Sequence, residues 1–132
     1  MKKILCLSMM VLLLISCAER EEEATHFDPA FVHVVYFWMK DPASIQDRKA
    51  LEVSLKKFME HSKYARTKFV GIPPKASREI VDDSFAYTLV LTFSSAEDQE
   101  LYQKEAAHLT FIAESQDLWE RVVVYDATGL VQ

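Results

Sequence analysis

In the stretch Phe31-Val-His-Val-Val-Tyr-Phe-Trp-Met39, every residue except His33 is apolar or aromatic. Turn-forming pairs bound it on both sides, Asp28-Pro29 before it and Asp41-Pro42 after it. β-Branched and aromatic residues between such pairs predict a β-strand. Because successive side chains of a strand point to opposite faces of its sheet, this strand is apolar on both faces. One face carries Phe31, His33, Val35, Phe37 and Met39, and the other carries Val32, Val34, Tyr36 and Trp38.

The remaining segments predict one ferredoxin-like domain of the α+β class. Ser44 is a candidate N-cap, and the apolar spacing from Leu51 to Met59 predicts a helix that ends near His61. Three further strands are predicted at 68–72, 85–93 and 121–126. Ser95, with Asp98 three residues on, is the candidate N-cap of a second helical region that runs to about 116. A break is possible in that region near Ala106 and Ala107. The order is β-α-β-β-α-β, which is typical of ferredoxin-like folds.

The second apolar face of the first strand predicts an oligomer. Two helices can cover only one face of a four-stranded sheet, so the other face would expose a larger apolar patch than soluble monomers normally carry. A second copy of the sheet is the economical cover, and twofold interfaces are the commonest kind. We therefore expect a homodimer, a dimeric α/β barrel whose two sheets enclose a shared core or cavity.

The amino-terminal segment predicts export and lipidation. Lys2 and Lys3 precede an apolar run that is too short to span a bilayer comfortably, and Leu14-Ile15-Ser16-Cys17 resembles the lipobox of bacterial lipoproteins. We expect residues 1–16 to be a signal peptide, Cys17 to be acylated, residues 17–30 to form an acidic tether, and residues 31–132 to form the domain. An ordinary secretory signal with an incidental cysteine is the alternative.

Lipidation of Cys17 would make the membrane a partner and place the protein in the cell envelope, with the outer membrane as the expected site. The protein would be either periplasmic or surface-exposed. The acidic stretch 18–25 is a solvated spacer or, alternatively, resembles the surface-export signal of some Gram-negative lipoproteins.

Composition argues against several functional classes. The formal net charge of −5 gives no electrostatic footprint for nucleic acid. No histidine or cysteine pair has the spacing of a metal site, and two glycines cannot build a glycine-rich phosphate loop. We therefore expect no metal and no cofactor.

The chain resembles the stress-responsive A/B barrel (Dabb) domains, which are dimeric α+β barrels. The resemblance covers most of residues 31–127. It rests on the opening strand, on the strand at 85–93, on Leu101-Tyr102 followed by Ala107-His108, and on the closing Val122-Val-Val-Tyr-Asp126. Family members often show His-Pro-Ala-His where this chain has Glu105-Ala-Ala-His108, so the first histidine and the proline are missing.

The resemblance implies His108, Tyr102 and His33 as candidate catalytic residues, because plant polyketide cyclases of the family use a matching histidine and tyrosine. A neutral imidazole can take a proton from a carbon acid while a phenol donates to the developing enolate. Tyr102 and His108 lie six apart, so they converge only if the helix breaks between them. Each also has a structural interpretation: a hydrogen-bonded core histidine at His33, a structural His108, and a tyrosine ring that caps the core.

Three functions remain open. The first is binding of a small hydrophobic ligand in the barrel cavity, with Phe37, Tyr87 and Leu89 as candidate ligand-binding residues. The second is a cofactor-independent lyase, cyclase or monooxygenase that uses His108 and Tyr102. The third is a structural dimerisation module without a ligand, which a tightly packed barrel would favour.

Overall fold

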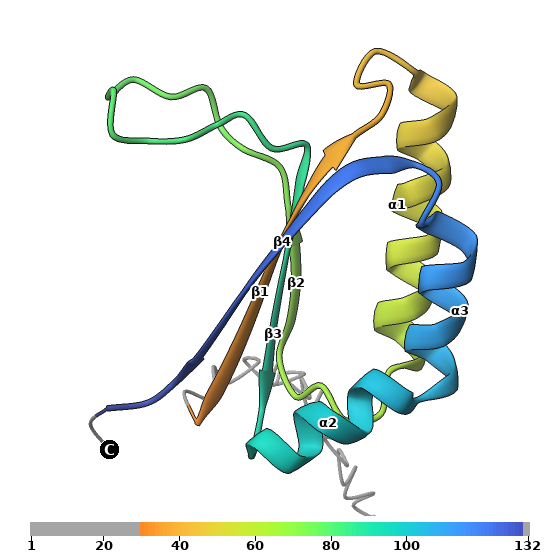
Figure 1. Cartoon of the computed structure of the whole chain (residues 1–132), viewed down its shortest axis with the longest axis vertical. Helices are drawn as coiled ribbons and strands as arrows, with labels where there is room; N and C mark the ends of the chain where they lie inside the picture. Colours follow the sequence, from red (N-terminus) through yellow and green to blue (C-terminus); the bar gives the residue numbers. More distant parts are fainter. Residues whose placement is uncertain (1–29, 131–132) are drawn as a thin grey trace, which may run out of the picture.

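The computed structural model describes residues 30–130 and shows one four-stranded antiparallel sheet. Its strands are β1 (Phe31–Met39), β2 (Lys68–Gly71), β3 (Tyr87–Phe93) and β4 (Trp119–Thr128), in the order β2-β3-β1-β4 (Figure 1). The predicted ferredoxin-like α+β fold is confirmed. The predicted signal peptide, the candidate lipidation site Cys17 and most of the tether lie outside the described residues.

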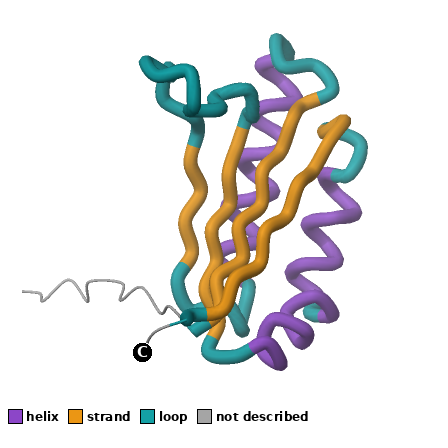
Figure 2. Tube along the Cα trace, turned by 60° about the vertical axis from the view of Figure 1, so that its left-hand side comes forward, coloured by secondary structure: helices purple, strands orange, loops and turns teal. Residues whose placement is uncertain are grey.

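Three helices cover one face of this sheet (Figure 2). They are α1 (Ile45–His61), α2 (Ala96–Lys104) and α3 (Ala106–Ser115). The hydroxyls of Ser44 and Ser95 accept hydrogen bonds from the backbone N–H groups of Asp47 and Asp98, so both predicted N-caps are present. Because helices lie on one side only, the sheet has a helix-covered face and an open face.

The core lies between the sheet and the helices. Burial along β1 alternates strictly, and the residues at odd positions from Phe31 to Met39 are the buried ones, as the sequence predicts. Leu51, Leu55 and Phe58 of α1 pack against them. A hydrophobic core of its own is what allows a segment to fold as an independent domain.

The open face of the sheet keeps a large apolar surface. Val34 and Tyr36 of β1 are only half-buried, while Phe69 of β2 and Tyr125 of β4 are 55% and 63% exposed. The loop 72–86 projects beyond the sheet on the side away from the helices (Figure 1). The expectation that β1 is apolar on both faces is therefore confirmed.

The bounds of β3 and β4 differ from the predictions because strand pairing sets where each strand begins and ends. β4 is longer than the predicted 121–126 because it pairs with the whole of β1. Thr128 pairs with Phe31 at one end of this ladder, and Trp119 pairs with Met39 at the other. β3 begins two residues later than predicted, because its ladder with β1 ends at the Phe37–Tyr87 pair. Cross-strand pairing is set by the partner strand, which local composition does not contain.

The described residues contain neither a membrane-spanning helix nor a metal-binding cluster. None of the helices between residues 30 and 130 is long and apolar enough to cross a membrane. Within the same part of the chain, no group of three or more histidine, cysteine, aspartate or glutamate side chains could hold a metal ion.

Candidate functional site

The second helical region is interrupted at Glu105, which separates α2 from α3. Glu105 has an extended backbone, with φ −69° and ψ 148°, and so cannot continue the helix. Its carboxylate accepts hydrogen bonds from the Ser62 hydroxyl at 2.6 Å and the Lys63 backbone N–H at 2.9 Å. Contacts with the residues at the end of α1 therefore hold the break.

This break brings Tyr102 and His108 together. Tyr102, near the end of α2, is 2% exposed, and its ring centroid lies 4.6 Å from that of half-buried His108. Phe58 contacts both rings, at 5.8 Å from Tyr102 and 6.0 Å from His108. The predicted pair needs a helix break between Tyr102 and His108, and this break is present.

His33 joins the same cluster from β1. It is 4% exposed, and its ring centroid lies 5.6 Å from that of Tyr102. Its Nδ1 lies 2.5 Å from Oδ1 of Asp126, a side chain that is 43% exposed at the β4 edge of the sheet. We call His33, Tyr102 and His108 the His–Tyr cluster.

Sequence reasoning did not single out Asp126. Asp126 and His33 are direct partners in the antiparallel ladder between β4 and β1, so their side chains emerge on the same face. Both residues lie in predicted strands, but their contact could be predicted only with the register that pairs the two strands.

Hydrogen bonds fix the tautomers of the two histidines when they are neutral. The Nδ1 of His108 lies 3.2 Å from the carbonyl oxygen of Gln103, and a carbonyl can only accept. The carboxylate beside the Nδ1 of His33 is likewise an acceptor. In each neutral ring the proton therefore sits on Nδ1, and Nε2 carries the lone pair that a general base needs.

The environment moves the pKa values of His108 and Tyr102 in opposite directions. Burial lowers the pKa of His108, and nearby His33 lowers it further, against the effects of the Gln103 carbonyl and Glu105. Burial also raises the pKa of the Tyr102 hydroxyl well above its usual range, helped by the carboxylates of Glu105 and Asp126. At neutral pH, His108 is therefore a neutral base and Tyr102 a protonated donor, which is the division of roles that acid–base catalysis requires.

The three candidate ligand-binding residues lie elsewhere in the core. Phe37, Tyr87 and Leu89 are 2%, 2% and 1% exposed between the sheet and the helices. The Tyr87 hydroxyl donates to Glu52 at 2.6 Å, so that residue has a structural partner. Their role in ligand binding stays a prediction.

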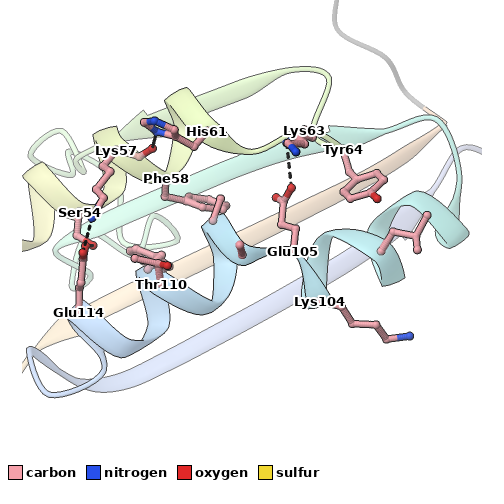
Figure 3. A pocket seen from close by; sticks show the side chains of 14 residues that line it. Ser54, Lys57, Phe58, His61, Lys63, Tyr64, Lys104, Glu105, Thr110 and Glu114 are labelled. Atoms are coloured by element: carbon pink, nitrogen blue, oxygen red, sulfur yellow. Dashed lines mark hydrogen bonds and ion pairs between the residues drawn. The ribbon is translucent and has the colours of Figure 1, made fainter.

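A groove of about 580 Å³ lies on the helical side of the domain, between α1 and α3 (Figure 3). Phe58 and Phe111 are its aromatic wall, and their rings stack at 5.2 Å. No member of the His–Tyr cluster lines this groove, but Phe58 contacts both the groove and the cluster. Sequence reasoning missed the groove, because it depends on how two helices pack.

Residues 31–128 match the Stress responsive A/B Barrel Domain, abbreviated Dabb. The chain belongs to this family. The match spans all four strands and three helices of the Dabb domain, including the whole His–Tyr cluster. No curated protein shows a sequence match to the chain.

Solved structures share the fold at low sequence identity. A hydroxynitrile lyase from Passiflora edulis is 20% identical with a TM-score of 0.64, over 76% of this chain and 94% of the lyase. A dimeric protein of unknown function from Bacteroides fragilis is 16% identical with a TM-score of 0.62, over 79% of this chain and all of the other. A Dabb family protein from Mesorhizobium loti is 16% identical with a TM-score of 0.63, over 76% of this chain and 97% of the other.

Proposed function

We propose that this Dabb protein is a cofactor-independent enzyme of the lyase or cyclase type, which moves a proton on a small hydrophobic substrate at the His–Tyr cluster. The observation that carries the proposal is the 4.6 Å approach of Tyr102 and His108 with pKa values shifted in opposite directions. Groups whose environments push their pKa values apart are the usual acid and base of a site. The likeness to a hydroxynitrile lyase supports a fold that can carry such chemistry.

In this reaction, each residue has a separate task. The Nε2 atom of His108 takes a proton from a carbon next to a carbonyl group, the C–H electrons form a C=C bond, and the π electrons of the carbonyl move onto its oxygen. The Tyr102 hydroxyl makes no hydrogen bond within residues 30–130 and donates to the oxygen on which charge develops. Asp126 holds the ring of His33 beside Tyr102.

A coloured weak acid tests the proposal directly. We would titrate residues 18–132 with 4-nitrophenol near neutral pH and record the absorbance of the bound probe. A site that takes the proton and donates to the oxyanion binds the probe as phenolate, and His108→Asn and Tyr102→Phe each remove the phenolate band. Failure of the wild-type chain to bind the probe at millimolar concentration would contradict the proposal.

The second candidate is a binding module that holds a small hydrophobic ligand without turnover. It is favoured by the low exposure of Tyr102 and His33, at 2% and 4%, which leaves little room for reaction. A purely apolar pocket excludes charge and so binds the neutral phenol. The same titration therefore separates the two functions, because a bound neutral probe supports the module and a bound phenolate supports the enzyme.

We infer that the protein works as a homodimer that joins the open faces of two sheets. The half-buried Val34 and Tyr36 and the exposed Phe69 and Tyr125 form the apolar surface that a partner would cover. Two structures of the same fold, from Bacteroides fragilis and Thermobifida fusca, are described as dimeric, and they support this assembly. Native mass spectrometry of residues 18–132 gives the oligomeric state and any ligand that copurifies, and a monomer at micromolar concentration would contradict it.

We also propose that acylated Cys17 anchors the protein in the cell envelope of a bacterium. The support is the lipobox-like sequence that ends at Cys17. Cys17→Ser should release the protein from the membrane fraction. Retention of this variant in membranes would contradict the anchor, and protease treatment of whole cells would separate a periplasmic from a surface-exposed protein.

A further inference from the structure

We propose that the groove between α1 and α3 binds the apolar part of the substrate, and that Phe58 is the partition between this groove and the His–Tyr cluster. The inference rests on the proposed function for the chemistry at the cluster, but the groove itself is an independent observation. It assigns the substrate class: a small, uncharged, weakly acidic molecule with one ring or a short chain.

The size and lining of the groove fit such a molecule. Its volume of about 580 Å³ lies within the range of roughly 300–1,000 Å³ that is typical of small-molecule sites. The stacked rings of Phe58 and Phe111 form an apolar wall, and the small side chains of Ala106 and Ala107 leave the space between the helices open. Polar and charged side chains, Lys57, Glu105 and Glu114 among them, make up much of the remaining lining, so the apolar wall is the part that would hold a ring or short chain.

Two polar bridges join α1 and the residues after it to the opposite side of the groove. At one end, Glu114 accepts hydrogen bonds from Lys57 and Ser54 of α1, at 2.5 and 2.9 Å. Farther along, Glu105 accepts hydrogen bonds from the Ser62 hydroxyl and the Lys63 backbone N–H, and Figure 3 shows the bond to Lys63. The groove continues past Glu105 to Tyr64 and Lys104, and the stretch between the two bridges, where Phe58 lies, is the part that would hold the ring or chain of the ligand.

These bridges also bear on the ligand charge that the groove favours. The charge of Glu114 is already neutralised by Lys57, and the pKa of Glu114 is lowered by its hydrogen bonds with Lys57 and Ser54. Lys104 borders the groove, but its ammonium group points away from it (Figure 3). Because both acids already have donors from the chain, a positively charged ligand would gain little from them, and the stacked aromatic rings suit an uncharged ring or chain.

The position of Phe58 connects the groove to the chemistry. Its ring stacks on Phe111 at the groove and lies 5.8 Å from Tyr102 and 6.0 Å from His108. A rotation of this one ring would open the groove toward the cluster, so that a ligand held in the groove presents its acidic group to Tyr102 and His108.

Two adjacent positions of α3 give a matched test. Thr110 lines the groove and Leu109, which is 57% exposed, does not. With residues 18–132 and 4-nitrophenol as the probe, we expect Thr110→Trp to fill the groove and weaken binding on the order of tenfold. Leu109→Trp should bind the probe like the wild-type chain.

The outcomes separate this inference from the proposed function. If Thr110→Trp binds the probe as tightly as the wild type while the bound probe is still phenolate, the groove is not the binding site and the cluster chemistry stands. If the wild-type chain binds only neutral phenol and Thr110→Trp still weakens binding, the groove stands and the chemistry does not. Equal weakening by both tryptophan variants would overturn the groove assignment.

A second variant tests the partition. Phe58→Leu keeps an apolar side chain in the core but removes part of the ring, and circular dichroism would confirm that the variant folds. We expect stopped-flow absorbance to show faster appearance of the phenolate band than in the wild type. An unchanged rate in the folded variant would show that Phe58 does not separate the groove from the His–Tyr cluster.

Discussion

The rings of Tyr102 and His108 lie 4.6 Å apart, although the two residues belong to different helices. In a continuous helix, residues six apart point to different faces. The extended backbone of Glu105 turns α3 away from α2 and so places both rings against Phe58. The candidate site therefore depends on one break in one helix.

Removing the Glu105 carboxylate should destabilise the domain and separate the two rings. Glu105→Ala loses both hydrogen bonds to the end of α1, and we expect the free energy of unfolding to fall by about 1–3 kcal/mol. Denaturant unfolding measures the change. Glu100→Ala, at an exposed position of α2, is the control and should change stability by less than about 0.5 kcal/mol. Equal stability of the two variants would mean that Glu105 does not hold the break.

The lowered pKa of His108 predicts that the domain loses stability in weak acid. The unfolded chain takes up this proton near the usual pKa of 6.5, whereas the folded chain takes it up only at lower pH. The free energy of unfolding should therefore decrease as pH falls below 6.5, until the folded pKa is reached. His108→Gln should flatten this part of the pH profile, and an NMR titration midpoint for His108 above 6.5 would contradict the prediction.

Tyr102 should resist ionisation in the folded protein. The usual tyrosine pKa is 10.0, and that of Tyr102 is raised, so the folded state keeps its proton when the unfolded chain would lose it. The contribution of Tyr102 to stability is present below pH 10 and is lost as pH rises through the folded pKa. A spectrophotometric titration of tyrosinate should show two late steps, because burial also raises the pKa of Tyr87, and Tyr102→Phe should remove the later step.

The same Tyr102→Phe variant should be nearly as stable as the wild type at neutral pH. The hydroxyl makes no hydrogen bond within residues 30–130, so removing it costs less than about 1 kcal/mol. A stable variant that has lost the 4-nitrophenolate band would assign the hydroxyl to function. A loss of several kcal/mol on denaturant unfolding would assign it to structure.

Asp126→Ala should cost more stability than its partial exposure suggests. The substitution leaves the Nδ1 of buried His33 without an acceptor, and we expect a loss of about 1–3 kcal/mol on denaturant unfolding. Asp126→Asn keeps an oxygen at the same place and should recover most of that loss. Asp117→Ala is a suitable control, because this side chain is 95% exposed and its ion pair with Lys40 is long, at 3.9 Å.

A charge on the open face should dissociate the proposed dimer. Val34 lies on that face, between Val90 of β3 and Tyr125 of β4, so Val34→Glu would bury a carboxylate in the interface. Light scattering after size-exclusion chromatography should then give the mass of a monomer. Val53→Glu, at a 59% exposed position of α1 on the other side of the molecule, should leave the dimer intact. A dimeric Val34→Glu variant would place the interface elsewhere.

The sequence by itself determined the element order, the two N-caps and the two faces of β1. These are local properties: alternation of side chains along a strand, apolar spacing along a helix, and a serine that caps the backbone. The family resemblance added His33, Tyr102 and His108, and these three residues do lie together.

Only the tertiary structure decided how that cluster is built. Two alanines do not demand a break before His108, and the break is instead held by Ser62 and Lys63, more than 40 residues away in the sequence. The pairing of His33 with Asp126 depends on strand register, and the groove behind Phe58 depends on the spacing of α1 and α3. Local composition fixes which elements form, whereas contacts between distant segments fix where their side chains meet.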